Sequence, residues 1–165
     1  MTIRSDHTGA FPPARPETCP RQLRLVDITP DNWRSNLAVR EDQTRFVANH
    51  AVLLARAYAY RAQRSRAFLV CDGDRPVGMG LYYDCPELAA YDFSQLFIDA
   101  RWQGRGYGRA AVALVLEALR RDGVFDRVVL CYVEGNDSAR RLYERFGFVE
   151  TDRDGDEIGM ELSLS

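Results

Sequence analysis

Three glycines within five residues form the part of the sequence best suited to binding a ligand. Gly104, Gly106 and Gly108 follow the apolar run 91–98, and from residue 107 onward apolar residues recur at helical spacing until Gly123. A glycine-rich turn between a buried strand and a helix lets the backbone approach a ligand closely, and the helix N-terminus favours negative charge. The order of strand, glycine turn and helix therefore predicts a site for a phosphate or pyrophosphate.

The residues around these glycines argue against two other phosphate-binding sites. A Walker loop needs a lysine on the terminal phosphates, and all 22 basic residues of this chain are arginine. The run 106–111 also matches the dinucleotide pattern G-x-G-x-x-A, but only residues 124–165 follow the helix, which leaves no room for the βαβ units of that fold. Neither nucleotide hydrolysis nor dinucleotide binding is expected.

Tyr143 is a polar residue on the helix that the sequence predicts after Asn136. It stands about two helical turns after Asn136, so both side chains share one face of the helix that the sequence predicts there. A phenol with an ordinary pKa near 10 can give up a proton without carrying a charge itself. Two alternatives stay open: Tyr143 packs beside Leu142 and Phe146, and Asn136 acts only as a helix cap.

Two segments together resemble the GCN5-related N-acetyltransferase (GNAT) superfamily. Residues 103–108 (QGRGYG) fit Q/R-x-x-G-x-G/A, the pyrophosphate loop of that superfamily, and residues 136–148 (NDSARRLYERFGF) are similar to its second signature segment. The runs LRLVDITPDNW and EDQTRFVANH resemble the start of the diamine and spermidine acetyltransferase branch. The resemblance extends from about Gln22 to the C-terminus, with both motifs in the expected order.

This resemblance implies an α/β fold in which a mixed central β-sheet is flanked by helices and two parallel central strands splay apart. It implies acetyl-CoA as the cofactor, with the pantetheine arm between those strands. Main-chain contacts to the arm are expected at Leu96, Phe97 and Ile98, and Tyr143 is expected to protonate the departing thiolate. The other expected cofactor-binding residues are Gln103, Gly104, Arg105, Gly106, Tyr107, Gly108, Arg109 and Asn136.

The implied reaction is transfer of an acetyl group from acetyl-CoA to the primary amine of a small molecule, with a diamine or polyamine favoured. The alternatives are an amino acid derivative, an aminoglycoside-like compound, a protein N-terminus, or a non-catalytic acyl-CoA-binding domain. Substrate contacts are expected at Asp84 and Glu87, because the acidic connector 84–90 adjoins the cofactor strand and attracts cations.

The ammonium of an amine substrate must lose a proton before it attacks, so the site needs a general base. Ser94 and Gln95 stand where several polyamine acetyltransferases carry an acidic residue. The candidates that remain are Asp84, Glu87, Asp92 and Glu134.

Hydrophobic periodicity and turn residues predict the elements that position these groups. Strands are expected at 22–28, 67–71, 76–83, 91–98, 127–133, 148–152 and 156–162. One helix should begin at Thr29 and Pro30 and carry Trp33, Leu37 and Val39, and a second should span about 42–61. The remaining helices are expected at 107–122 and between Asn136 and Gly147. Strand 91–98, helix 107–122 and strand 127–133 form a right-handed crossover, so the two strands run parallel.

Composition bounds the remaining possibilities. The 165 residues suit one domain, predicted at 22–165 and preceded by a proline-rich flexible tail at 1–21. A net charge of −2 gives no electrostatic case for nucleic acid, and no apolar run is long enough for a membrane span. The first residues lack a signal-peptide pattern, so a cytoplasmic protein with free thiols and no metal site is expected, and a homodimer stays open.

Overall fold

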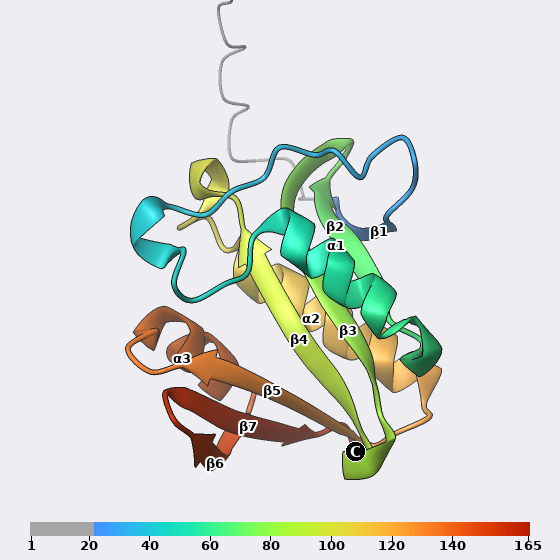
Figure 1. Cartoon of the computed structure of the whole chain (residues 1–165), viewed down its shortest axis with the longest axis vertical. Helices are drawn as coiled ribbons and strands as arrows, with labels where there is room; N and C mark the ends of the chain where they lie inside the picture. The colour runs from blue at the N-terminus through green and yellow to red at the C-terminus, as the bar shows by residue number, and fades with distance from the viewer. Residues whose placement is uncertain (1–21) are drawn as a thin grey trace, which may run out of the picture.

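The structure is a computed structural model that describes residues 22–165, so the predicted N-terminal tail lies outside the described residues. Seven strands form one mixed sheet in the order β1-β2-β3-β4-β5-β7-β6 (Figure 1). The strands are β1 (Leu23–Asp27), β2 (Arg66–Asp72), β3 (Arg75–Cys85), β4 (Ala90–Ile98), β5 (Arg127–Val133), β6 (Val149–Asp154) and β7 (Glu157–Ser163). The α-helices are α1 (His50–Ala59), α2 (Tyr107–Asp122) and α3 (Asp137–Glu144). Single 3₁₀ turns are η1 (Glu41–Gln43), η2 (Arg61–Gln63), η3 (Pro86–Leu88) and η4 (Ala100–Trp102).

The sheet buries a separate apolar core on each face. Helix α2 lies behind β3 and β4 in the view of Figure 1, and α1 lies in front of them. The core on the α2 side joins Phe93 with Leu116 and Tyr143, whereas the core on the α1 side joins Leu53 with Phe97. No helix within residues 22–165 is long and apolar enough to cross a membrane, and Cys71, Cys85 and Cys131 are free thiols.

Strand β4 contains a bulge at the centre of the sheet. Leu81 of β3 pairs with Gln95, but Tyr83, two residues further along β3, pairs with Asp92, three residues back along β4. One extra residue therefore sits in β4 between these pairs, which changes the face to which the following side chains point. This is why Phe93 belongs to the α2-side core and Phe97 to the α1-side core.

The parallel strands β4 and β5 separate just after they meet. They pair only at Tyr91–Val128 and Asp92–Val129. Beyond Asp92, β4 keeps its ladder with β3 on one side and has no strand partner on the other. We call this divergence the fork. The predicted α/β fold, with a mixed sheet and splayed central strands, is confirmed, and α2 has the predicted bounds.

The predicted helix at Thr29 is wrong, because the chain makes only one turn there, over residues 30–34. The Thr29 hydroxyl does accept the Asp31 N–H, as a cap should. The Asn32 side chain, however, bonds back to Asp27 O at 2.9 Å and to the Thr29 N–H at 2.8 Å. Further on, the backbone of Ala38 bonds to residues 99 and 100 instead of within a helix.

The helix predicted at about 42–61 is shorter than expected. The short turn η1 and then an irregular segment precede α1, which Asn49 caps by accepting the Val52 N–H at 3.0 Å. Residues 44–49 do not continue the helix back from Asn49, because the backbone of Asn49 is extended, with a ψ of 165°. Ala48 O accepts a hydrogen bond from the Gln95 side chain. We call residues 36–49 the strap, since they cross the front of the molecule between β1 and α1 (Figure 1).

Candidate functional site

The glycine-rich turn reaches the start of α2 in a conformation that glycine favours. Gly104 has a φ of +73° and Gly106, the N-cap of α2, a φ of +82°, both in the left-handed region. A Cβ atom at Gly108 would meet only Leu142 Cδ2 at 3.7 Å and Ile98 Cγ1 at 3.8 Å. The first N–H groups of a helix lack intrahelical acceptors, so this end of α2 offers donors to an anion.

Three side chains around this turn have structural contacts of their own. The Tyr107 side chain is buried and its hydroxyl donates to Asp72 at 2.6 Å, so only its backbone faces the turn. Gln103 Nε2 donates to Gln43 Oε1 at 2.8 Å and to Ile98 O at 2.9 Å. The Arg105 guanidinium lies over the Trp102 ring, and Arg109 is exposed on α2. The side chains of Gln103 and Tyr107 therefore brace the loop, and cofactor binding by these two residues stays a prediction.

A cleft of about 420 Å³ brings most of the predicted residues together. It lies between the unpaired edge of β4, the glycine turn, α3 and the strap. Its predicted members are Leu96, Phe97, Ile98, Gln103, Gly104, Gly106, Tyr107, Gly108, Asn136 and Tyr143, whereas Arg105 and Arg109 are not among its lining residues.

Sequence reasoning missed one whole wall of this cleft. The strap supplies that wall, and no sequence signal marks its residues as part of the site. The α3 residues could have been found, because they share the face of Asn136 and Tyr143. The missed lining residues are Val39, Arg40, Gln43, Phe46, Val47, Trp102, Ser138, Ala139 and Leu142.

Helix α3 presents Tyr143 to the cleft with its hydroxyl uncommitted. The ring packs edge-on against Phe93 and Phe148, with centroid distances of 6.3 and 5.5 Å, and 8% of the residue is exposed. Burial raises the pKa of Tyr143 to about 12. Within residues 22–165 no hydrogen bond to its hydroxyl is present. Asn136 accepts the Ala139 N–H at 3.2 Å, so it caps α3 while also lining the cleft.

Asp92 lies at the base of the fork in a polar cluster on the α1 side of the sheet. Its carboxylate accepts a hydrogen bond from the Tyr83 hydroxyl, which also bonds with Ser94. Arg56 of α1 donates to Ser94 Oγ at 3.2 Å. Burial raises the pKa of the Asp92 carboxyl, and the Tyr83 hydrogen bond and the charge of Arg56 oppose that rise.

Two further carboxylates lie near Cys131 of β5, on the same side of the sheet as Asp92. Burial raises the pKa of the Cys131 thiol, and the nearby charges of Glu157, Asp92 and Asp152 raise it further. Cys131 pairs with Gly159 of β7, and the Asp152 side chain lies directly over that glycine. We call Asp92, Asp152, Glu157 and the exposed Cys131 the open face. Within residues 22–165 no group of three or more His, Cys, Asp or Glu side chains could hold a metal ion.

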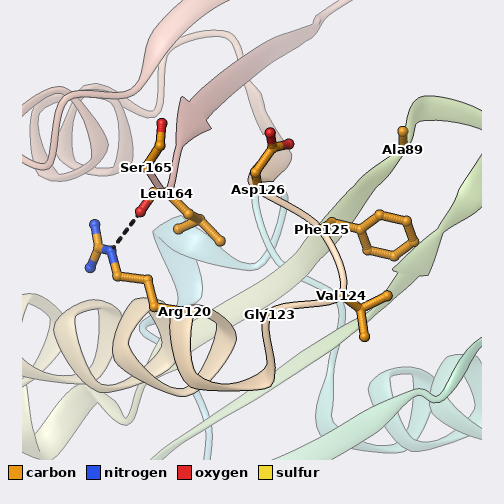
Figure 2. Close-up of a pocket in the computed structure, with 8 residues that line it drawn as sticks. All are labelled: Ala89, Arg120, Gly123, Val124, Phe125, Asp126, Leu164 and Ser165. Atoms are coloured by element: carbon orange, nitrogen blue, oxygen red, sulfur yellow. Dashed lines mark hydrogen bonds between the residues drawn. The ribbon is translucent and has the colours of Figure 1, made fainter.

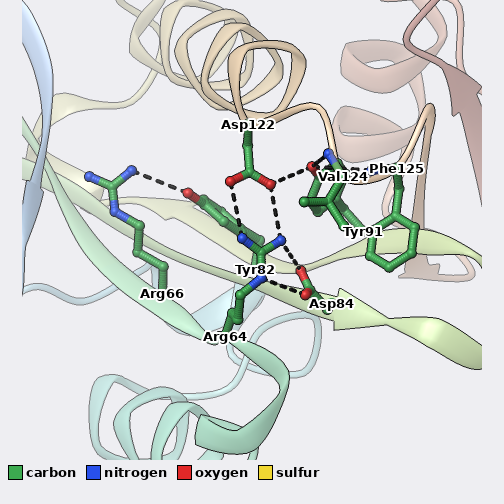
Figure 3. Close-up of polar contacts among 8 residues, drawn as sticks. All are labelled: Arg64, Arg66, Tyr82, Asp84, Tyr91, Asp122, Val124 and Phe125. Atoms are coloured by element: carbon green, nitrogen blue, oxygen red, sulfur yellow. Dashed lines mark hydrogen bonds and ion pairs between the residues drawn. The ribbon is translucent and has the colours of Figure 1, made fainter.

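The two expected substrate residues lie elsewhere and have other partners. Asp84 accepts two hydrogen bonds from Arg64, at 2.7 and 3.0 Å, and Arg64 also contacts Asp122 (Figure 3). Glu87 contacts the Cys85 thiol in the β3–β4 connection. Neither lines the cleft. Among the other base candidates, Glu134 is exposed and paired with Arg153 at 3.0 Å, which leaves Asp92 nearest the fork.

A second hollow, of about 570 Å³, holds none of these groups. It lies beyond the C-terminal end of α2 and is lined by Ala89, Arg120, Gly123, Val124, Phe125, Asp126, Leu164 and Ser165 (Figure 2). The Arg120 Nε donates to the Leu164 carbonyl at 3.3 Å, so its one basic side chain already has a backbone partner. None of the predicted site residues lines it, and the cleft at the fork remains the candidate site.

Comparison with known proteins gives consistent matches in sequence. Residues 24–148 match the Acetyltransferase (GNAT) family. Over 150 residues the chain is 30% identical to the spermine/spermidine N(1)-acetyltransferase of Bacillus subtilis (strain 168), covering 82% of this chain and 95% of that protein. A stretch of 78 residues is 45% identical to the mycothiol acetyltransferase of Beutenbergia cavernae, but it spans only 26% of that protein and 47% of this chain.

Solved structures of similar fold include two acetyltransferases. The spermidine N-acetyltransferase of Vibrio cholerae, in complex with CoA and spermine, superposes with a TM-score of 0.70 at 20% identity, covering 87% of this chain and 96% of that one. An acetyltransferase of Thermus thermophilus gives a TM-score of 0.71 at 22% identity, with 86% and 96% covered. At these identities the likeness establishes the fold of residues 22–165 and leaves the substrate to be argued from the site.

Proposed function

The chain belongs to the GNAT family of acetyltransferases, which use acetyl-CoA, and we propose that it acetylates a primary amine of a linear di- or polyamine. The observation that carries the substrate class is the open face, where Asp92 lies at the base of the fork and the carboxylates of Asp152 and Glu157 lie near Cys131 of β5. The assignment of the acetyl donor follows the family, and the acceptor is our inference from charge and position.

The cleft fits the donor that the family requires. The left-handed turn at Gly104 and Gly106 and the open space at Gly104 suit close approach of a pyrophosphate to the α2 N-terminus. The edge of β4 from Phe93 to Ile98 has no strand partner on the fork side, so its backbone groups can hydrogen-bond an extended amide-bearing chain. Acetyl-CoA would supply the acetyl group as an activated thioester.

Two residues of this chain can move the protons that amine acetylation requires. Asp92, on the open face, accepts a proton from the acceptor ammonium, directly or through one water. Tyr143, on the cleft side of the fork, donates the proton of its uncommitted hydroxyl to the leaving sulfur. The two groups lie on opposite sides of the divergence of β4 and β5, so acceptor and donor can approach from different directions.

The charges of the open face support a cationic acceptor. Asp152 and Glu157 are exposed and Asp92 is half-buried, so they can interact with a flexible chain that carries several ammonium groups. Exposed carboxylates raise the local concentration of cations, and this attraction weakens as salt screens it. The Bacillus relative bears the name of a spermine/spermidine N(1)-acetyltransferase, which agrees with this substrate class.

Steady-state kinetics with a panel of amines tests the proposal. Spermidine, spermine, putrescine, an amino acid amide, an aminoglycoside and a peptide N-terminus would be compared by chromatographic quantification of released CoA. We expect the highest kcat/KM for a di- or polyamine, falling as ionic strength rises. A preference for a peptide or a neutral amine would refute the acceptor class, and absence of turnover with intact acetyl-CoA binding would favour a non-catalytic domain.

A charge-matched pair of variants locates the acceptor. Glu157→Gln removes one carboxylate of the open face, whereas Glu117→Gln removes one from the outer surface of α2. Both variants have the same net charge. We expect the first to raise the KM for spermidine about 3–10-fold and the second to leave it unchanged.

A further inference from the structure

Among the residues that the structure describes, two polar side chains are buried, and both bind the strap. Gln95 and Asp99 have 8% and 3% of their surface exposed. Gln95 Nε2 donates to Ala48 O at 2.7 Å, and Asp99 Oδ2 accepts the Ala38 N–H at 3.0 Å. A buried polar group costs free energy unless it is hydrogen-bonded, so each of these contacts favours one position of the strap over others.

The other contacts of the strap lie mostly near its start. Leu37 is buried in the α1-side core, Ala38 O accepts the Ala100 N–H at 2.8 Å, and Asn36 O accepts from Arg101 at 3.1 Å. The regular structure of the strap is the three-residue turn η1, and no part of it pairs with a strand. Toward residue 48, Val47 packs against the α1-side core, and the side chains of Gln95 and Gln103 supply the hydrogen bonds to distant elements. Val47 also lines the cleft, so the position of this wall depends in part on those side-chain bonds.

The two buried residues hold opposite ends of the wall. Asp99 also binds Arg101 in the turn that leads to the glycines, so its end of the strap adjoins the pyrophosphate loop. Gln95 holds the other end. Ala48 lies between Val47, which lines the cleft, and Asn49, which caps α1. Helix α1 carries Arg56, whose guanidinium reaches Ser94 beside Asp92 on the open face.

We propose that Gln95 is a positioning residue for the amine acceptor, because its bond to Ala48 fixes the corner 44–49 between the cleft and the open face. This inference rests on the proposed function. When that bond is lost, Val47 and the first turn of α1 are no longer held at the fork, and the acceptor meets a binding-competent wall only part of the time. The pyrophosphate loop keeps its own contacts through Asp99 and Gln103, so the anion-binding end of the cleft is unaffected.

The variant Gln95→Leu tests this division, because leucine keeps the bulk of the side chain and removes the donor. We expect the KM for spermidine to rise about 5–10-fold, the scale of one lost buried hydrogen bond, while the calorimetric Kd for acetyl-CoA stays within twofold. Asn32→Ala is the matched control, since it removes a side-chain amide that holds the connection near β1, away from the cleft. Equal KM values for Gln95→Leu, Asn32→Ala and the wild type would overturn the proposal.

A nearly isosteric variant and a measurement without substrate complete the test. In Gln95→Glu the protonated carboxyl can donate to Ala48 O and the ionised form cannot, so the ratio of its spermidine KM to that of the wild type should rise with pH. Because a carboxylate at position 95 would also act on Asp92 and Arg56, the same ratio is measured for Gln95→Leu, which introduces no ionisable group and should show no such rise. Hydrogen exchange should show faster exchange at residues 44–49 in Gln95→Leu than in Asn32→Ala.

Hydrogen exchange also separates this inference from the proposed function. If no amine is acetylated, the proposed function fails, and the exchange rates still decide whether Gln95 holds the corner. If polyamines are acetylated but neither the KM nor the exchange at 44–49 responds to Gln95→Leu, the positioning role fails alone.

Discussion

The substitution Tyr143→Phe isolates the phenol as the proton donor. Phenylalanine keeps the ring contacts with Phe93 and Phe148, and the lost hydroxyl has no hydrogen-bond partner within residues 22–165. The free energy of unfolding should therefore change by less than about 0.5 kcal/mol. If the phenol protonates the sulfur, kcat should fall about 10²–10⁴-fold, equivalent to roughly 3–5 kcal/mol of transition-state stabilisation.

Tyr132→Phe provides the matched comparison, because Tyr132 is equally buried but donates to Glu150 at 2.6 Å. It should lower the free energy of unfolding by about 1–2 kcal/mol in a urea titration and leave kcat unchanged. CoA release would be quantified by chromatography at saturating acetyl-CoA. A Tyr143→Phe enzyme with wild-type kcat, or one whose activity loss merely follows a loss of folded protein, would refute the acid role and leave Tyr143 as a packing residue.

The pH profile adds a second check on Tyr143. Because burial raises its pKa to about 12, the phenol stays protonated throughout an assay between pH 7 and about 10. Deprotonation of Tyr143 should therefore produce no alkaline fall in kcat within that range. An alkaline limb near pH 9 that disappears in Tyr143→Phe would contradict the pKa direction on which this argument depends.

Three further outcomes are expected. Gly106→Val places a β-branched residue at a φ of +82° beside the anion site, so it should weaken acetyl-CoA binding at least about tenfold by calorimetry. Gly155→Val, at a φ of +62° in the β6–β7 turn, should lower the stability of the fold without changing acetyl-CoA binding. Asp92→Asn should lower kcat/KM about 10²-fold or more and abolish the acidic limb of the pH profile of kcat/KM. In the wild type this limb should lie above the ordinary carboxyl pKa, because burial raises the pKa of Asp92. A variant whose pH profile keeps the limb would exclude Asp92 as the base. Arg64→Met should lower the free energy of unfolding by about 1 kcal/mol near pH 7, a value kept small because the Arg64 side chain is half exposed. Arg64 lowers the pKa of Asp122, so its contribution to stability is present above about pH 4 and is lost as pH falls through the lowered pKa. The melting temperatures of the variant and the wild type should therefore converge in acid.

Elements with local signals could be predicted from the sequence. Helix α2 begins at the left-handed Gly106 and ends before the left-handed Gly123, and its buried residues follow the helical period. The strands and the crossover between β4 and β5 followed in the same way from apolar runs and turn residues. The predicted lining residues of the cleft came largely from two motifs, the glycine-rich turn and the segment 136–148, which the fold brings to two sides of the cleft.

The strap could not be predicted, because its determinants are distant in sequence. Thr29 and Pro30 give a genuine cap signal, but only one turn follows. Gln95 and Asp99, about 50 and 60 residues further along, take the backbone bonds that a helix would have made. Long-range contacts of this kind routinely override the local helix propensity, and the sequence pattern of residues 36–49 does not predict them.

Asp92 was among the residues predicted from the sequence, but the other two carboxylates of the open face were not. Asp84 and Glu87 were favoured because they precede β4 in the chain, yet Arg64 already pairs with Asp84. Asp152 and Glu157 come near Cys131 only through the register of β5 with β7 and of β7 with β6. A bulge within β6 changes which of its side chains face that side, and sequence alternation cannot locate such an irregularity.

The fork also divides the sheet into two ladders that few backbone hydrogen bonds join. Strands β1 to β4 form one continuous ladder and β5, β7 and β6 form another, and two residue pairs at Tyr91 and Asp92 join them. Few backbone bonds must break for the smaller part to separate locally, so the amides that join β4 to β5 should exchange with solvent in an opening event of lower free energy than global unfolding. A ligand that spans the fork would bind only the closed arrangement and suppress that opening as its concentration rises. The protection of the paired residues 91–92 and 128–129 would then report occupancy of the cleft, although none of them lines it.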